Sequence, residues 1–393
     1  MSLLPRGALA WTLTVLGGLS CLPAAVTFYF ALVPESWTRL AALGVQALLR
    51  APELLVPSAV ALVLTIAALR SGAMAGAIGW ALTALLLGGV ALGSLAANWR
   101  RASAYGAQVS VAAALLPRFH GEPQGRRETR IYAVPAAGSE LRLDHFRAQG
   151  VADGSSRPAV VRVHGGAWNH GGRGDLPLWN EWLASLGFDV FDIEYRLPPP
   201  ARYLDEIGDV KCALGWVVDN AASYHVDPER VSLFGHSAGA NLALLAAYSA
   251  GDARLPPSCP VRVVKPRAVV NAYGPVDLAR LYETTPSPSS MRPLLAAYLG
   301  GSLAEKPERY ALVSPVHYVR AESPPTFTLH GEVDRVVPLE QAALLDRALG
   351  RQRVPHEMVT FPWSDHAFDV VWNSLATQAA RAKLQAFLER YAR

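Results

Sequence analysis

Cysteine is scarce in this chain of 393 residues, and its positions lack the paired spacing of a metal-binding or disulfide-rich domain. Cys21, Cys212 and Cys259 are an odd number, so the sequence predicts no disulfide framework and no metal site. This usage mildly favours a reducing compartment. Nucleotide-binding glycine loops of the Gly-x-Gly-x-x-Gly and Walker types are also absent, so nothing implies a nucleotide cofactor.

Charge of one sign is not in large excess, with 36 Lys and Arg against 32 Asp and Glu. The basic residues form no cluster with interleaved aromatic residues, which is the usual pattern of a nucleic-acid-binding surface. The sequence therefore indicates no nucleic-acid partner.

Charged residues are almost missing from the first hundred positions. The uncharged stretches are residues 7–34, 54–69 and 71–99. They are rich in Leu, Ala and Val, and they meet or approach the roughly 20 residues that cross a bilayer. Residues 1–99 are therefore predicted to be a transmembrane region, and the lipid bilayer is an expected partner. The predicted transmembrane helices are residues 8–33, 52–70 and 73–98.

Other interpretations exist for single stretches. The first stretch is also compatible with a signal peptide that has Arg6 as its basic start, and any single stretch is compatible with a buried core helix. A lipoprotein site at Cys21 fits poorly, because Gly18 stands three residues before it. None of these alternatives removes the two later stretches.

The arginines that flank the predicted spans indicate an orientation. Three spans put the N-terminus and the rest of the chain on opposite sides of the membrane. One side would carry four flanking arginines and the other two, namely Arg39, Arg50, Arg100 and Arg101 against Arg6 and Arg70. Because cytoplasmic flanks are enriched in Lys and Arg, the count predicts a cell-membrane protein with residues 129–393 in the cytoplasm.

The sequence Gly235-His236-Ser237-Ala238-Gly239 follows an apolar strand pattern at residues 231–234 and precedes a small-residue helix pattern at residues 240–247. A Gly-x-Ser-x-Gly between a strand and a helix is typical of a nucleophile elbow, in which the serine occupies a strained turn. Ser237 is thus the candidate nucleophile, and His236 beside it is interpreted as structural.

Two further signals accompany the elbow. The strand pattern at residues 158–163 ends in His164-Gly165-Gly166-Ala167-Trp168, and the one at residues 326–331 is followed by Asp334. His366 stands between a further strand pattern and the last helix. The order Ser, Asp, His is the one that an α/β-hydrolase sheet produces.

With these motifs, residues 158–393 resemble the α/β-hydrolase superfamily. Within it they resemble the esterase and lipase branch, which includes hormone-sensitive-lipase-like enzymes and acetyl-esterase-like enzymes with a His-Gly-Gly-x-Trp loop. Ala167 in place of a third glycine favours the latter group. Residues 194–200 read Glu-Tyr-Arg-Leu-Pro-Pro-Pro where many relatives carry Tyr-Arg-Leu-Ala-Pro-Glu. This missing acidic residue leaves the subfamily and the substrate open.

The predicted chemistry is nucleophilic catalysis. A serine hydroxyl needs a base to take its proton, so His366 is assigned as general base and Asp334 as the carboxylate that orients its ring. Asp365 and Glu332 are alternatives for the acid, but neighbouring side chains such as Asp365 and His366 rarely point at each other.

The backbone N–H of Ala238 is expected to contribute to an oxyanion hole. The resemblance implies that Gly166 and Ala167 supply the other donors, and that His164, Gly165 and Trp168 support this loop. Asp205 and Asp209, one helical turn apart, are expected to be solvated or to cap a helix.

The predicted fold class is α/β, an α/β-hydrolase fold with a mostly parallel sheet, preceded by about three transmembrane helices. Residues 100–128 are expected to be a linker or lid, and residues 129–393 the catalytic domain. Residues 275–316 contain several prolines and little periodicity, which is typical of a lid or cap over the substrate.

The sequence thus predicts a membrane-anchored serine hydrolase of small or lipid-like carboxylic esters, acting through an acyl-enzyme. Arylformamidase, prenylcysteine-methylesterase or acyltransferase chemistry with the same triad is the near alternative. A non-catalytic binding module with this fold is the more distant one.

Overall fold

The computed structural model describes most of the chain. The described residues are 7–32, 51–116, 118–121, 127–135, 140–152, 154–199 and 203–393. The chain divides into two compact units that interleave in the sequence. The helical unit comprises residues 1–119, 331–335 and 361–379, and the sheet unit comprises residues 120–330, 336–360 and 380–393. The boundaries predicted at residues 99 and 128 stay a prediction.

An eight-stranded sheet with the order β1-β2-β4-β3-β5-β6-β7-β8 forms the centre of the sheet unit. The strands are β1 (Arg127–Ala133), β2 (Leu141–Phe146), β3 (Arg157–Val163), β4 (Asp189–Ile193), β5 (Val226–His236), β6 (Val269–Ala272), β7 (Thr326–Gly331) and β8 (His356–Phe361). β1 pairs antiparallel with β2, and β2 with β4, whereas the pairs from β4 through β3, β5 and β6 to β7 are parallel. The predicted mostly parallel sheet is confirmed.

The central strands are apolar because both faces of the sheet are covered. All seven residues of β3 are buried, as expected for a parallel strand between helices. The helices around the sheet are α6 (Pro177–Ser185), α7 (Tyr203–Asp219), α8 (Ala238–Tyr248), α12 (Leu339–Arg351) and α13 (Leu375–Tyr391), with short 3₁₀ turns η2 (Ala221–Tyr224), η3 (Pro315–Tyr318) and η4 (Phe368–Val370). Val161 of β3, Leu233 of β5 and Leu242 of α8 share one apolar core.

The strand that leads to Ser237 is longer than the sequence predicts. β5 begins at Val226, and its pairing with β3 jumps from Arg157 opposite Val226 to Ala159 opposite Val231. The residues between them bulge out of the ladder, since Pro228 has no N–H to donate. Apolar patterning detects only the regular part after the bulge.

The prediction of no disulfide is wrong. Cys212 of α7 and Cys259 form a disulfide, with their Cα atoms 5.5 Å apart. The two residues are 47 positions apart in sequence, so no local spacing pattern predicts the bond. The segment around Cys259 is held against α7, where the N–H of Ser258 donates to the carbonyl of Gly208 at 3.0 Å.

The segment predicted as a lid contains short helices: α9 (Leu278–Thr284), α10 (Pro288–Leu299) and α11 (Pro307–Leu312). Asp277 caps α9, since its carboxylate accepts from the N–H of Arg280. Each of α10 and α11 begins with a proline in its first turn, where a missing N–H costs nothing. Short proline-started helices lack the long apolar periodicity that a sequence pattern detects.

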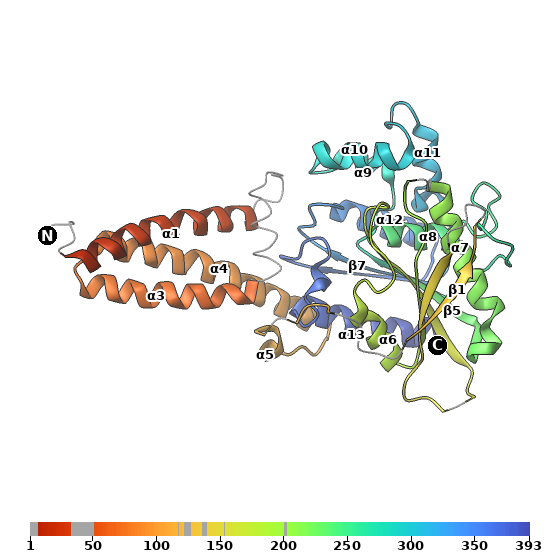
Figure 1. Cartoon of the computed structure of the whole chain (residues 1–393), viewed down its shortest axis with the longest axis horizontal. Coiled ribbons are helices and arrows are strands. Elements are labelled where there is room, and N and C mark those ends of the chain that lie inside the picture. Colours follow the sequence, from red (N-terminus) through yellow and green to blue (C-terminus); the bar gives the residue numbers. More distant parts are fainter. Residues whose placement is uncertain are drawn as a thin grey trace. The chain divides into compact units, whose positions relative to one another are not determined.

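The helical unit contains α1 (Ala8–Leu32), η1 (Ala51–Leu54), α3 (Leu55–Arg70), α4 (Met74–Ala104) and the short α5 (Val111–Ala114). α1, α3 and α4 run side by side (Figure 1). At the crossing of α1 and α4, a side chain on Gly76 would come within 2.7 Å of the Cα of Thr14, so only glycine permits this approach.

Within the described part of the chain, three helices are long and apolar enough to cross a membrane: Ala8–Tyr29, Ala51–Arg70 and Met74–Ala104. These correspond to the three predicted spans, although the third helix extends six residues beyond its predicted end at residue 98. The predicted end of the first span at residue 33, and the flanking Arg6, Arg39 and Arg50, lie outside the described residues.

Candidate active site

Ser237 occupies the sharp turn between β5 and α8. Its backbone has φ 53° and ψ −120°, a region that non-glycine residues rarely adopt. The N–H of Ser237 donates to the carbonyl of Ala272 in β6 at 2.9 Å, which fixes the turn to the sheet. A side chain at Gly239 would overlap the carbonyl of His164, so the helix approaches this strand only with glycine there. Ser237 thus lies in a strained turn between a strand and a helix, which is the geometry expected of a nucleophile elbow.

The segment His164 to Trp168, here called the glycine loop, lies against Ser237. A side chain on Gly165 would come within 3.4 Å of the Cβ of Ser237. Gly166, Ala167 and Trp168 have positive φ of 112°, 51° and 60°. Three consecutive residues in this conformation turn the backbone sharply, and two of them lack the glycine that makes it easy. Such local strain concentrates at functional sites.

Aromatic stacking supports the glycine loop from behind. The ring of His164 stacks on Tyr195 with centroids 4.1 Å apart, and the Tyr195 hydroxyl donates to the carbonyl of His164 at 3.1 Å. Burial lowers the pKa of His164 to about 4, so the ring is neutral at neutral pH. Its Nδ1–H donates to the carbonyl of Gly165 at 2.7 Å. Trp168 stacks on Tyr298 of α10 with centroids 4.6 Å apart.

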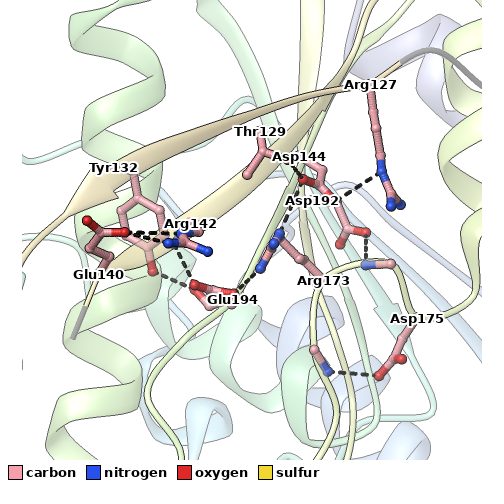
Figure 2. Close-up of polar contacts among 12 residues, drawn as sticks. Arg127, Thr129, Tyr132, Glu140, Arg142, Asp144, Arg173, Asp175, Asp192 and Glu194 are labelled. Atoms are coloured by element: carbon pink, nitrogen blue, oxygen red, sulfur yellow. Dashed lines mark hydrogen bonds and ion pairs between the residues drawn. The ribbon is translucent and has the colours of Figure 1, made fainter.

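The chain after the glycine loop is tied to the sheet by carboxylates (Figure 2). The Arg173 guanidinium forms ion pairs with Asp144 of β2, at 3.2 Å, and with Glu194, which follows β4. Asp192 of β4 accepts from the N–H of Gly174 at 2.8 Å. These contacts hold the downstream end of the loop in one position.

His236 has a structural environment, as the sequence predicts. Its ring stacks on Phe234 with centroids 4.5 Å apart, and its Nδ1 accepts from the buried guanidinium of Arg162 at 3.4 Å. Arg162 also donates to the carbonyl of Leu176 at 3.2 Å. Sequence reasoning missed Arg162, because one arginine inside an apolar strand pattern gives no sign of its partners.

Asp334 and His366 form a pair in the helical unit. The Nδ1–H of His366 donates to Oδ2 of Asp334 at 2.8 Å, and the Asp334 side chain is fully buried. Burial is the largest influence on the His366 pKa and lowers it. The charge of Asp334 and its hydrogen bond to the ring, with the charges of Asp365 and Asp369, outweigh burial, so the pKa lies above the ordinary 6.5.

The two alternative acids have other partners. Asp365 forms a buried ion pair with the Arg335 guanidinium, and it also accepts from the N–H of Arg335 at 3.0 Å. Glu332 pairs with Arg101 of α4 at 2.6 Å. The carboxylate that accepts from the Nδ1–H of His366 is that of Asp334.

The last turns of α4 contact both loops that carry this pair. Asn98 is buried, and its side-chain amide donates to the carbonyl of Pro362 at 2.9 Å. A side chain on Gly93 would come within 3.2 Å of Trp363, so the indole ring packs here because position 93 is a glycine. The two loops are joined to each other, since the N–H of Val333 donates to the carbonyl of Ser364 at 3.1 Å. Sequence reasoning did not single out Asn98.

The expectation for Asp209 is wrong. Asp209 is fully buried, and its carboxylate accepts from the Arg196 guanidinium at 2.7 and 2.8 Å and from the Ser258 hydroxyl at 2.6 Å. Asp205 is partly exposed and pairs with the same Arg196 at 3.1 Å. A buried carboxylate requires such pairing, which the spacing of two acids cannot reveal.

Comparison with known proteins identifies the family. The family model described as BD-FAE matches residues 149–349. The chain belongs to the BD-FAE family. The match includes the glycine loop, the elbow and Asp334, and it confirms the predicted esterase and lipase branch of the α/β-hydrolase fold.

Two mycobacterial relatives carry esterase names. The chain is 32% identical over 257 residues to the probable carboxylic ester hydrolase LipM of Mycobacterium tuberculosis, covering 64% of this chain and 58% of that protein. It is 33% identical over 275 residues to esterase LipQ of the same organism, covering 68% of this chain and 64% of that protein. The matches thus span less than two thirds of the length of either relative.

Among solved structures, the apo form of Thermogutta terrifontis esterase 2 is similar, with a TM-score of 0.59 and 25% identity. The similarity covers 70% of this chain and 97% of that protein. The predicted α/β-hydrolase fold is confirmed.

Proposed function

We propose that the protein hydrolyses carboxylic esters through an acyl-enzyme on Ser237, with His366 as general base and Asp334 as the residue that orients it. The observation that carries this proposal is the strained conformation of Ser237 beside the glycine loop. Ser237 follows β5 and Asp334 follows β7. The carboxyl ends of parallel strands lie at one edge of a sheet, which is where hydrolases of this fold assemble their triads.

The first chemical step is attack by the Ser237 oxygen on the ester carbonyl. His366 takes the serine proton at Nε2, because its Nδ1–H is held by Asp334. The resulting imidazolium is stabilised by the Asp334 charge, and it then gives the proton to the leaving alcohol. Water repeats the sequence on the acyl-enzyme and releases the acid.

The oxyanion of the tetrahedral intermediate would accept from the backbone N–H groups of Gly166, Ala167 and Ala238. This assignment is supported by the positive φ values of Gly166 and Ala167 and by the position of Ala238 at the start of α8. Each such donor contributes about 3 kcal/mol to lowering the barrier.

The protein is proposed to be anchored in a membrane by α1, α3 and α4. Their outward surfaces carry exposed apolar side chains such as Leu19, Val63 and Leu85. α4 has 31 residues and at ~1.5 Å per residue is longer than the ~30 Å hydrocarbon core. Its last turns, with Trp99 and Arg101, fit the membrane interface.

We propose that the sheet unit lies in the oxidising compartment. The flanking arginines predict the cytoplasm, by four against two. The Cys212–Cys259 disulfide favours the opposite side, since disulfides are rare in reducing cytosol.

The proposed substrate class is a carboxylic ester with a small to medium or lipid-like acyl group. The names of LipM and LipQ, a probable carboxylic ester hydrolase and an esterase, support the ester. Amide hydrolysis and acyl transfer use the same residues and remain outcomes of a substrate survey. A non-catalytic binding module would need neither the strained serine nor the Asp334–His366 pair.

The test is hydrolysis of p-nitrophenyl esters of increasing chain length by detergent-solubilised full-length protein. We expect turnover by the wild type and none by Ser237→Ala, a change that removes one hydroxyl and opens almost no cavity. Undiminished turnover by Ser237→Ala, or no turnover of any ester by the wild type, would contradict the proposal.

A further inference from the structure

A cavity of about 350 Å³ lies in the sheet unit between α7 and the lid helices, and the chemistry proposed above does not use it. Its walls include Tyr203 and Glu206 of α7, Tyr298 of α10 and Arg309 of α11. Tyr298 connects the cavity to the glycine loop, because its ring stacks on Trp168.

Glu206 is an acid without a counter-charge. It is 0% exposed, and neither of its carboxyl oxygens has a hydrogen-bond partner in the described part of the chain. The nearby acids Asp205 and Asp209 both form ion pairs with Arg196. Burial, and then the charges of Asp209 and Asp205, raise the pKa of Glu206 to about 10. At neutral pH it is therefore a neutral carboxylic acid that can both donate and accept.

Two more polar groups near Glu206 are unsatisfied. The hydroxyl of Tyr298 and the indole N–H of Trp168 are buried, and neither has a partner among the described residues. Buried polar groups are nearly always hydrogen-bonded, because leaving one unpaired is costly. Glu206 and Tyr298 both line the cavity, and Trp168 stacks on Tyr298, so a ligand bound there would complete the bonding of these groups.

Resting on the proposed ester hydrolysis, we propose that this cavity is a specificity pocket that binds a neutral, hydroxyl-bearing part of the substrate through Glu206 and Tyr298. A hydroxyl donates and accepts, as both of these groups do. Its hydrogen bonds would replace those that the pocket cannot make within the protein.

The surroundings disfavour a charged ligand. The Arg309 guanidinium lies over the Tyr203 ring at 5.8 Å and so occupies the aromatic face that would attract a cation. The faces of Trp168 and Tyr298 cover each other. For an anion, the cationic group among the residues that line the cavity is Arg309, and its guanidinium already donates to the carbonyl of Leu299 at 2.7 Å.

The experiment compares two esters of equal carbon skeleton, 2,3-dihydroxypropyl butyrate and propyl butyrate, hydrolysed by the full-length protein in detergent under pH-stat titration. We expect the wild type to prefer the dihydroxypropyl ester. Glu206→Leu should lower kcat/KM for that ester about tenfold, the factor of one lost hydrogen bond, chiefly through KM. The same variant should change kcat/KM for propyl butyrate by no more than about twofold.

Two further variants separate recognition from folding. Tyr298→Phe removes only the hydroxyl and should reduce the same preference with little change for propyl butyrate. The matched control Glu322→Leu changes an exposed glutamate in the loop before β7 and should leave both esters unaffected.

A pH profile tests the protonated carboxyl itself. In the wild type the preference for the dihydroxypropyl ester should fall as pH rises through about 10, since Glu206 ionises there. Glu206→Gln keeps a donor and an acceptor but cannot ionise, so its preference should persist over the same range.

The inference is overturned if Glu206→Leu lowers kcat/KM equally for both esters, or if it changes kcat/KM for neither. It is also overturned if the ratio of kcat/KM for the two esters does not change with pH in either the wild type or Glu206→Gln. A preference for butyrylcholine over propyl butyrate that Glu206→Gln abolishes would identify a cation pocket instead and also overturn it. Failure of the proposed function is distinguishable, because the wild type would then hydrolyse neither butyrate.

Discussion

At the residue scale, neighbouring carboxylates have different tasks because their partners differ. Asp334 accepts a hydrogen bond from His366, whereas Asp365 is neutralised by Arg335 in a buried ion pair. Asp334 can therefore hold the tautomer that leaves Nε2 of His366 free to act as a base. Asp365 holds Arg335 and, through its contact with the N–H of His366 at 2.7 Å, the backbone of the loop.

Asp334→Asn should lower kcat by several orders of magnitude, since the equivalent change in a serine protease costs about 10⁴-fold. Asp365→Asn should act mainly on stability, because breaking a buried ion pair costs about 3–5 kcal/mol. Steady-state kinetics and thermal unfolding of both variants check this division. Equal losses of kcat in two well-folded variants would assign the catalytic acid to Asp365 as much as to Asp334.

The raised pKa of His366 sets the acid limb of the pH–rate profile. A general base must be neutral, so kcat/KM for a short ester should rise with pH through a pKa above the ordinary 6.5. Asp334→Asn removes the nearby charge that raises the pKa, so any residual activity should show its acid limb at lower pH. A wild-type limb at or below 6.5 would contradict the electrostatic part of this account.

At the scale of elements, the sequence predicted the strands, the elbow and the three apolar helices, because each has a local pattern. It predicted Ser237 and the glycine loop for the same reason. Three features escaped because they join distant segments: the Cys212–Cys259 bond, the Arg196–Asp209 pair and the contact of Asn98 with Pro362. Packing creates these neighbours, and no spacing within one element encodes them.

The contact between α4 and the Pro362 loop makes a candidate membrane helix part of the support for His366. Asn98→Leu removes the hydrogen bond to Pro362 and should lower kcat for a soluble ester about tenfold or more, since small displacements of a catalytic group are costly. KM should change little. Leu92→Ala, at an exposed position of the same helix, is the control and should retain wild-type kinetics. Wild-type kcat in Asn98→Leu would show that α4 anchors without positioning.

At the scale of the whole molecule, the disulfide and the flanking arginines bear on the orientation of the three candidate spans. Of the three cysteines, Cys21 is free, while Cys212 and Cys259 are bonded. If the sheet unit faces an oxidising compartment, three spans leave the N-terminus in the cytoplasm. The flanking arginines favour the reverse arrangement, so the two arguments make opposite predictions.

Thiol counting separates them. Protein taken from membranes, denatured without reductant and labelled with a polyethylene-glycol maleimide should gain one label per chain, and three after reduction. Alkaline phosphatase fused after Arg393 should be active, and a fluorescent protein at the same place dark. Three labels before reduction, with a bright fluorescent fusion, would place the sheet unit in the cytoplasm.

The most direct test of the central claim is covalent labelling of the full-length protein with a fluorophosphonate, followed by mass spectrometry of its peptides. The account predicts one stoichiometric adduct on Ser237, absent from Ser237→Ala and much slower to form in Asp334→Asn. An unlabelled wild type, or an adduct that persists on another residue in Ser237→Ala, would contradict the assignment of Ser237 as the nucleophile.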